Sequence, residues 1–311
     1  MIPRETLVIG AGFLGTALAN HLASRGQRVH LLSRRPEPPH AAGLQFHRGN
    51  LDDPDHVRDL LKTCRTIYHT ACTTTPGSSA HNPVLEGMEN LLPTLTLLQT
   101  LQDSPDTHLV FLSSGGCLYG DLSGTPADER HCPQPVSYHG AGKAALEVFL
   151  HAYAHSQPSA ARVTVLRPSN LYGPGQSLRS GFGLVRTVLE RLRTNQPIDV
   201  WGDGETVRDY LYIDDLIEAC AVVDRHEHDR RYRVYNVSAG TGHSINQLIT
   251  TAERVSGRTA EVRRQPARSI DIQHVVLDSS VLHRDTGWCP VVTLEDGLRR
   301  TWKWLLEQNT A

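Results

Sequence analysis

Short apolar runs alternate with stretches of helical spacing through the first half of the chain. Five of these runs have the length and composition of buried strands; they cover residues 6–9, 28–32, 66–69, 108–112 and 162–166. Between the runs, apolar positions recur every three or four residues, as on one face of a helix; these segments cover residues 14–25, 57–62, 84–101 and 141–155. Because neighbouring parallel strands need a crossover helix, the alternation predicts an α/β fold with a Rossmann-type doubly wound parallel sheet.

The pattern changes after Arg167-Pro168. Turn-forming residues cluster at 172–176, and beyond them we expect a helix over 184–193 and a turn at 202–204. The remaining segments mix both spacings. The second half therefore predicts a smaller mixed α/β domain.

Composition and charge exclude several classes of protein. The 311 residues are 39% hydrophobic and 21% charged with a net charge of -2, so nothing favours nucleic acid or a membrane as partner. No apolar run approaches the roughly 20 residues that span a bilayer, and no signal sequence precedes the first strand. Six scattered cysteines without metal-like pairing indicate free thiols in a reducing compartment. We expect a soluble cytoplasmic protein without a bound metal.

A glycine-rich turn joins the first predicted strand to the first predicted helix. Gly10, Gly12 and Gly15 have the G-x-G-x-x-G spacing in the strand–turn–helix context that makes this motif informative. Gly10 permits the tight turn, Gly12 lets the backbone approach a pyrophosphate, and Gly15 lets helix and strand pack closely. Phe13 and Leu14 begin the helix, whose N-terminus attracts phosphate. The turn predicts a nicotinamide dinucleotide site.

The end of the second predicted strand distinguishes between the two dinucleotides. An NAD enzyme places a carboxylate there for the ribose 2′-hydroxyl, whereas NADP needs room and positive charge. Ser33, Arg34 and Arg35 occupy this place. NADP is therefore favoured and NAD is the alternative; two solvated surface arginines would also explain the residues.

Further motifs, in a fixed order, resemble the extended short-chain dehydrogenase/reductases, and within them the UDP-glucose 4-epimerase-like branch of the NAD-dependent epimerase/dehydratase family. The similar segments are residues 49–53, 69–72, 90–95, 113–120, 166–175 and 201–210, so the resemblance covers nearly the whole chain. One minor departure is Ile9, which stands at a position that is usually glycine in the family. The resemblance implies additional dinucleotide contacts from Asn50, Leu51, Thr70, Ala71, Cys72, Asn90, Ser113, Lys143 and Pro168.

The same resemblance implies a nucleotide-sugar substrate, most simply a UDP-sugar. Its diphosphate and ribose would be held by arginine forks and a carboxylate. The candidate substrate-binding residues are Cys117, Asn170, Trp201, Arg208, Arg268 and Asp271. The dinucleotide-binding domain would comprise residues 1–168 with about 208–236, and the substrate-binding domain residues 169–207 and 237–311. Helices like those at 84–101 and 141–155 pair between subunits in the family, which implies a homodimer.

The catalytic positions depart from the family pattern. The family places Tyr-x-x-x-Lys on one helix, but the residue four before Lys143 is His139. Tyr138 lies five residues before the lysine, about 100° off that helix face, and would reach it only with an inserted residue. The slot of the family's catalytic Ser or Thr holds Gly115, with Ser114 as a nearby candidate. Histidine can replace tyrosine as the general base, since imidazole ordinarily titrates near neutral pH.

Three functions are compatible with these residues. The first is a nucleotide-sugar epimerase that acts at C4 of a UDP-hexose through a transient ketone. The second is an NADPH-dependent nucleotide-sugar ketoreductase or a dehydratase. The third is a dinucleotide-binding protein with impaired catalysis, which the altered positions His139 and Gly115 would explain.

Overall fold

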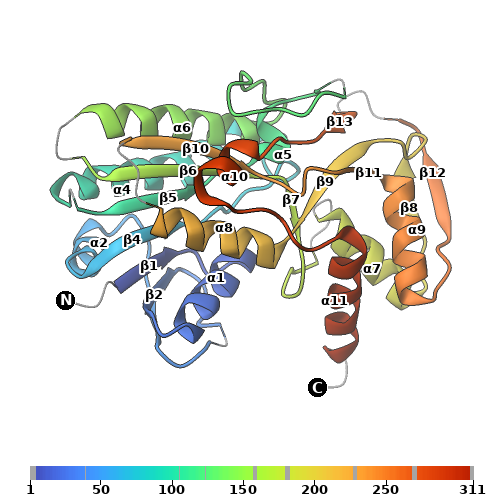
Figure 1. The fold of residues 1–311 in the computed structure, drawn as a ribbon, viewed down its shortest axis with the longest axis horizontal. Helices are drawn as coiled ribbons and strands as arrows, with labels where there is room; N and C mark the ends of the chain where they lie inside the picture. The colour runs from blue at the N-terminus through green and yellow to red at the C-terminus, as the bar shows by residue number, and fades with distance from the viewer. Residues whose placement is uncertain are drawn as a thin grey trace. The chain divides into compact units, whose positions relative to one another are not determined.

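The chain forms two compact units in a computed structural model (Figure 1). Unit 1 comprises Met1–Ser114, Ser137–Arg167 and Ile217–Tyr235, and unit 2 comprises Gly115–Val136, Pro168–Leu216 and Asn236–Ala311. The structure describes residues 5–38, 40–104, 106–122, 124–156, 160–178, 183–226, 230–267 and 272–308. This division differs from the expected domains at residues 115–136, 168, 208–216 and 236, which lie in unit 2. Strand contacts explain the difference, because Ala127 bridges to Leu277 and Arg208 lies in a strand of the smaller sheet.

A seven-stranded sheet forms the centre of the first unit. Its strands are β1 (Glu5–Ile9), β2 (Arg28–Ser33), β3 (Leu44–Arg48), β4 (Cys64–His69), β5 (His108–Leu112), β6 (Arg162–Pro168) and β10 (Tyr232–Val237). Their order is β3-β2-β1-β4-β5-β6-β10, and the strands from β3 to β6 pair in parallel. The order reverses between β1 and β4, the place where doubly wound sheets bind ligands. The predicted fold class is confirmed.

Helices cover both faces of this sheet (Figure 1). They are α1 (Phe13–Ser24), α2 (Pro54–Leu61), α3 (Pro83–Glu86), the π-helical turn η1 (Gly87–Leu91), α4 (Leu92–Thr100), the 3-10 turn η2 (Leu101–Asp103), α6 (Tyr138–Ser156) and α8 (Ile213–Arg225). One core cluster joins α2, α4 and α6 to the strands through Leu60, Leu97 and Leu150. On α1, the buried residues Leu18 and Leu22 supply its apolar face.

The second unit contains two small sheets. One has four strands, β7 (Asn170–Tyr172), β9 (Val207–Tyr212), β11 (Gly242–Ser244) and β13 (His274–Val275); the other pairs β8 (Ile198–Trp201) with β12 (Val262–Gln265). The helices are α5 (Gly115–Leu118), α7 (Leu184–Thr194), α9 (Ile245–Ser256), α10 (Ser280–Thr286) and α11 (Leu294–Glu307). A capping box, in which Ser244 and Gln247 bond each other's backbone N–H groups, fixes the start of α9.

Several elements differ from the sequence prediction. Helix α2 begins at Pro54 rather than Val57, because the side chain of Asp53 accepts a hydrogen bond from the His56 N–H. Helix α6 begins three residues early, at Tyr138, in spite of its glycines. The segment predicted as one helix over 84–101 contains the π turn η1, and β3 was not predicted.

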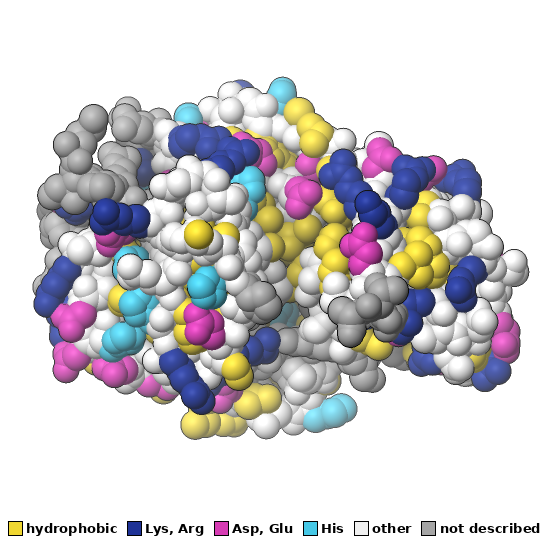
Figure 2. Space-filling view, turned by 90° about the horizontal axis from the view of Figure 1, so that it is seen from below, with side chains coloured by type: hydrophobic (Ala, Val, Ile, Leu, Met, Phe, Trp, Pro, Cys, Tyr) yellow, Lys and Arg dark blue, Asp and Glu magenta, His cyan; other side chains and the backbone are white. Residues whose placement is uncertain are grey.

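The described surface carries both signs of charge. Figure 2 shows cationic and anionic side chains interspersed over the face it presents. Within the described ranges, no helix combines the length and the apolar character that crossing a membrane requires.

Candidate active site

The glycine turn lies where β1 and β4 end. Gly10 has φ +106°, and a Cβ placed on it would lie 2.7 Å from the Ala71 Cα. A Cβ on Gly15 would overlap the Gly10 carbonyl oxygen and the Thr70 hydroxyl. The Thr70 hydroxyl donates to the carbonyl oxygens of Ile9 and Gly10, at 2.9 and 3.0 Å. Two of the three glycines are therefore required by close packing within the protein itself.

The third glycine has a different environment. Gly12 precedes α1, and no atom of the described residues lies within 4 Å of a Cβ built on it. Among the residues that the structure describes, no side chain caps the N–H groups at the start of the helix, at Phe13 and Leu14, and the first turn of α1 carries no carboxylate. Uncapped N–H groups and the helix dipole attract an anion. This end of α1 fits the pyrophosphate of a dinucleotide.

Several residues at the end of β2 and beyond it already form hydrogen bonds or ion pairs within the protein. The hydroxyl of Ser33, which is buried, accepts a hydrogen bond from the Arg35 N–H at 3.1 Å. Arg34 forms an ion pair with Glu89 of η1 at 2.9 Å, and the Arg35 side chain is exposed. Beyond β3, the Asn50 side chain bonds the Leu51 N–H and the Asp52 carboxylate, and Leu51 is buried.

Helix α6 presents His139 and Lys143 on one buried face. Their exposed fractions are 8% and 5%, whereas Tyr138 is 45% exposed and lies off this face. The Lys143 ammonium donates to the Leu112 carbonyl oxygen at 2.7 Å and lies 4.8 Å from the centre of the Phe111 ring. The lysine is thereby held at the carboxyl end of β5, in the same unit as the glycine turn.

The His139 imidazole lies next to the buried side chains of Thr74 and Glu86 and the half-buried side chain of Cys72. Its Nδ1 lies 3.1 Å from the Thr74 hydroxyl, 3.8 Å from the Cys72 sulfur and 3.9 Å from a carboxylate oxygen of Glu86. Thr74 and Glu86 were not predicted as site residues. The signal was the spacing of Glu86 and Asn90, two polar residues four apart and therefore on one face of a mostly apolar helix.

The two serines after β5 differ in their contacts. The Ser113 hydroxyl donates to Glu147 at 2.5 Å, and Glu147 pairs with Arg167 through two carboxylate oxygens. All three side chains are buried, so Ser113 belongs to an internal ion-pair network. Ser114 is half-buried and is the last residue of unit 1. The next residue, Gly115, has no hydroxyl to offer a substrate.

The candidate substrate-binding residues of the second unit differ in their hydrogen bonds and in their exposure. Asn170 donates to the Asp209 carbonyl oxygen at 3.1 Å, and a Cβ on Gly116, next to Cys117, would lie 3.3 Å from the Asn170 amide oxygen. The Arg208 guanidinium donates to the carbonyl oxygens of Val207 and Ile272. Trp201 is 41% exposed at the end of β8. Arg268 and Asp271 lie outside the described residues, and Pro168 ends β6.

Asp209 itself is fully buried. Burial raises the pKa of its carboxyl to about 6, although the Ser169 hydroxyl and the N–H groups of Ala239 and Gly240 donate to it. The carboxylate therefore fastens β9 to the segment after β10.

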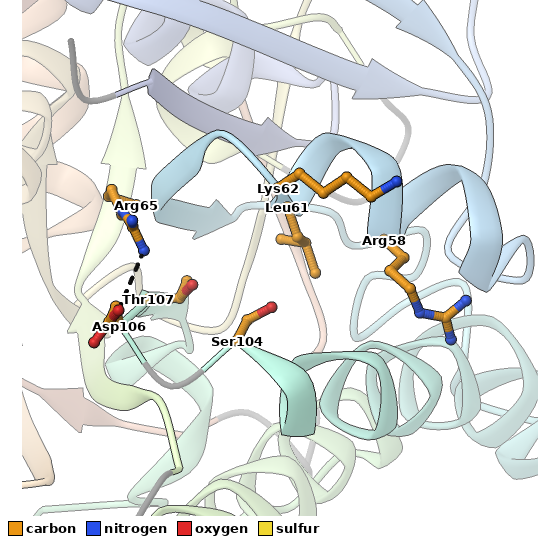
Figure 3. Close-up of a pocket in the computed structure, with 7 residues that line it drawn as sticks. All are labelled: Arg58, Leu61, Lys62, Arg65, Ser104, Asp106 and Thr107. Carbon is orange, nitrogen blue, oxygen red and sulfur yellow. Dashed lines mark ion pairs between the residues drawn. The ribbon is translucent and has the colours of Figure 1, made fainter. Parts of the chain in front are cut away.

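Two surface hollows lie away from these residues. One hollow, drawn in Figure 3, lies among Arg58, Lys62, Arg65 and Asp106, where Arg65 pairs with Asp106 at 3.6 Å. The other lies near Glu5, at the amino end of β1. Both hollows are at the amino ends of the strands, whereas doubly wound sheets bind ligands at the carboxyl ends. Both hollows therefore lie at the opposite ends of the strands from the glycine turn.

Known proteins resemble the chain over its whole length. Its sequence is 29% identical to the UDP-glucose 4-epimerase of Mycolicibacterium smegmatis, covering 96% of this chain and 97% of that protein. It is 27% identical to an Escherichia coli dTDP-4-dehydro-6-deoxyglucose reductase, covering 93% of both. The Thermotoga maritima UDP-glucose 4-epimerase with UDP-glucose superposes with a TM-score of 0.91 at 27% identity, covering 98% of this chain and 99% of that one.

A second solved structure is the Thermus thermophilus UDP-glucose 4-epimerase in complex with NAD. It superposes with a TM-score of 0.88 at 31% identity, and the match covers 97% of this chain and 99% of that one. The model of the NAD dependent epimerase/dehydratase family matches residues 6–238. The predicted resemblance is confirmed: this chain belongs to the NAD-dependent epimerase/dehydratase family.

Proposed function

We propose that this protein is a nucleotide-sugar epimerase that inverts C4 of a UDP-hexose, with His139 as its general base. The observation that carries the proposal is the buried face of α6, where His139 takes the position of the family's tyrosine and Lys143 is four residues further on. The relatives named as UDP-glucose 4-epimerases supply the substrate class.

In the proposed reaction, different residues of the chain act as the base, hold the cofactor and bind the substrate. A bound dinucleotide would supply the hydride acceptor and donor for oxidation and reduction at C4. His139 would take the proton of the C4 hydroxyl as the C4 alcohol is oxidised to a ketone, and would give the proton back when the ketone is reduced from the other face. Lys143, fixed by its bond to the Leu112 carbonyl oxygen, would hold the nicotinamide ribose. Cys117, Asn170, Trp201 and Arg208 of unit 2, with Arg268 and Asp271, would bind the nucleotide diphosphate.

One assay separates the three candidate functions. An epimerase interconverts UDP-glucose and UDP-galactose without consuming added dinucleotide. A ketoreductase oxidises NADPH in the presence of a 4-keto nucleotide sugar, the chemistry to which the E. coli relative's name points. A binding protein does neither and is only stabilised against heat by the dinucleotide.

The base is identified by a pair of variants. His139→Gln is expected to lower kcat by about 10²- to 10⁴-fold, the usual contribution of a general base. Tyr138→Phe is the matched control, because Tyr138 is exposed and lies off the catalytic face. Full activity in His139→Gln, or loss in Tyr138→Phe, contradicts the assignment of His139.

For the cofactor we propose NADP, on the basis of Ser33 and Arg35. Arg35 is exposed and Ser33 is small, which leaves room and positive charge for a 2′-phosphate. Arg34 would have to exchange Glu89 for the phosphate. Titration with each dinucleotide tests the proposal: Arg35→Ala should weaken NADP about tenfold and leave NAD nearly unchanged. Tighter binding of NAD by the unmodified protein would refute it.

A homodimer is proposed from apolar side chains that remain exposed on two helical segments. Val84, Met88 and Leu92 are 64%, 64% and 58% exposed along the segment from α3 to α4, and Val148 and Phe149 are 70% and 46% exposed on α6. Exposed apolar groups at helical spacing commonly mark an interface. In the family, helices at these places pair between subunits.

A further inference from the structure

A buried carboxylate lies behind the imidazole of His139. Glu86, at the end of α3, is 4% exposed, and Thr74, which follows β4, is 5% exposed. The Thr74 hydroxyl is 2.5 Å from one Glu86 oxygen and 3.1 Å from the His139 Nδ1. The side chains thus form a chain from carboxylate to hydroxyl to imidazole, which we call the Glu86 relay.

Hydrogen-bonding capacity fixes the direction of each bond in the relay. A hydroxyl has one hydrogen and two acceptor lone pairs. The Glu86 carboxylate can only accept, so it takes the Thr74 hydrogen. The Asn90 amide nitrogen, at 2.9 Å, can only donate, so it uses one Thr74 lone pair. The remaining lone pair faces His139, whose Nδ1 must therefore carry a hydrogen.

The orientation of the Asn90 amide is settled by its other bonds. Its oxygen accepts from the Thr73 N–H at 3.0 Å, and its nitrogen also donates to the second Glu86 oxygen at 3.0 Å. A reversed amide would place its oxygen against the carboxylate. The neutral His139 therefore has its hydrogen on Nδ1, and Nε2 is left with the lone pair that a base needs.

The Glu86 carboxylate packs against α6 at Gly142, where the helix has no side chain. A Cβ built on Gly142 would lie 2.5 Å from the Glu86 Oε1 and 2.7 Å from its Cγ. Glycine costs about 1 kcal/mol relative to alanine inside a helix. The space that Glu86 occupies explains the glycine at position 142.

We propose that Glu86, acting through Thr74, is a positioning residue for His139. It holds the imidazole in the Nδ1–H form and stabilises the cation that forms when Nε2 accepts the substrate's hydroxyl proton. The proposal rests on His139 as the base of the proposed reaction. A buried anion beside an imidazole lowers the energy of the imidazolium, because the interior screens charge weakly.

Other groups also face the imidazole. The Cys72 sulfur lies 3.8 Å from Nδ1, and Lys143 is one turn further along α6. Lys143 opposes a positive charge on His139, and Glu86 is the anion that balances it, at 3.9 Å from Nδ1. Tyr138, next in the chain, is exposed and does not join the relay.

Nuclear magnetic resonance tests the relay without any catalytic readout. In ¹⁵N-histidine-labelled protein, the signal lost in His139→Gln identifies His139, and its nitrogen shifts report which nitrogen carries the hydrogen. We expect hydrogen on Nδ1 in the unmodified protein, and on Nε2 or on both in exchange in Glu86→Gln. Hydrogen on Nε2 in the unmodified protein refutes the relay.

Kinetics supply the second test. Glu86→Gln and Thr74→Val should each lower kcat about 10- to 1000-fold with KM changed less than threefold, and should move the acidic limb of the kcat profile to lower pH. Thr74→Ser, which keeps the hydroxyl, should restore both kcat and the profile. Asp59→Asn, which removes an exposed carboxylate on α2, should change neither.

The outcomes separate this proposal from the proposed function. If His139→Gln stays active, the base is wrongly assigned. If His139→Gln is inactive but Thr74→Val keeps the kcat and the pH profile of the unmodified enzyme, the base is correct and the relay is refuted.

Discussion

His69 should make the fold sensitive to acid. It ends β4, is fully buried, and receives no hydrogen bond at Nδ1 from the described residues. Its Nε2 lies 3.1 Å from the Thr94 hydroxyl, which itself donates to the Asn90 carbonyl oxygen, so Nε2 carries the hydrogen. Burial, with the Lys143 charge, lowers the pKa of His69 to about 3. The native protein therefore keeps this imidazole neutral.

The sign of the effect follows from comparing the folded and unfolded chains. In the unfolded chain the imidazole is protonated below about pH 6.5, whereas in the folded chain it stays neutral down to about pH 3. The unfolded state thus gains protons first, and stability falls as the pH is lowered from 6.5 towards 3. At pH 5 the loss from this one residue is about 2 kcal/mol, since each pH unit corresponds to about 1.4 kcal/mol.

His69→Gln removes this loss but keeps an N–H donor for Thr94. Urea denaturation at pH 8 and pH 5 should show that the free energy of unfolding of the unmodified protein drops about 2 kcal/mol more than that of the variant. Other titrating groups, such as Asp209, are present in both proteins and cancel. His81→Gln, which removes an exposed imidazole, should behave like the unmodified protein. Equal pH dependence in the unmodified protein and His69→Gln would refute the reasoning.

Three further predictions concern other parts of the structure. Gly10→Ala places a Cβ 2.7 Å from Ala71 at a positive φ and should cost about 1–3 kcal/mol of stability by thermal denaturation, whereas Gly12→Ala should melt normally and lose dinucleotide affinity by calorimetry. Arg167→Met leaves the Glu147 carboxylate buried without its guanidinium partner and should lower the free energy of unfolding by about 3–5 kcal/mol. Adding Glu147→Leu to this variant should restore most of the lost stability, and equal stabilities of the single and double variants would contradict the reasoning. Leu92→Glu should yield a monomer by light scattering if the exposed apolar segment is a subunit interface, and an unchanged mass would argue against that interface.

The sequence predicted those features that depend on local pattern. The glycine turn is recognisable because strand, turn and helix follow one another within a few residues, and the parallel sheet follows from the alternation of strands with helices. Strand β3 was not predicted because Leu44–Arg48 is a short edge strand with a charged end and two polar positions. Its neighbour β2 supplies the pairing that its own sequence does not specify.

The local pattern can mark Glu86 as a polar position on a mostly apolar helix, but it does not predict the contacts that join Glu86 and Thr74 to His139. Thr74 and His139 are 65 residues apart in the chain and meet only because the segment after β4 passes next to α6. The sequence predicts a histidine base at 139, but nothing near that position indicates which residues contact it. The contacts that orient a catalytic side chain are set by tertiary packing, which overrides the periodicity of either segment.

Because residue 142 has no Cβ, the amino acids at positions 86 and 142 should depend on each other during evolution. A chain with glutamate at 86 and alanine at 142 would force the carboxylate against a methyl group, since the two would be 2.5 Å apart. A chain with glycine at 142 and no acid at 86 would keep the helix-weakening residue without the group it accommodates. Among relatives that have histidine in place of the tyrosine, the two residues should accordingly be gained or lost together, and an alignment of such sequences should show them as a correlated pair.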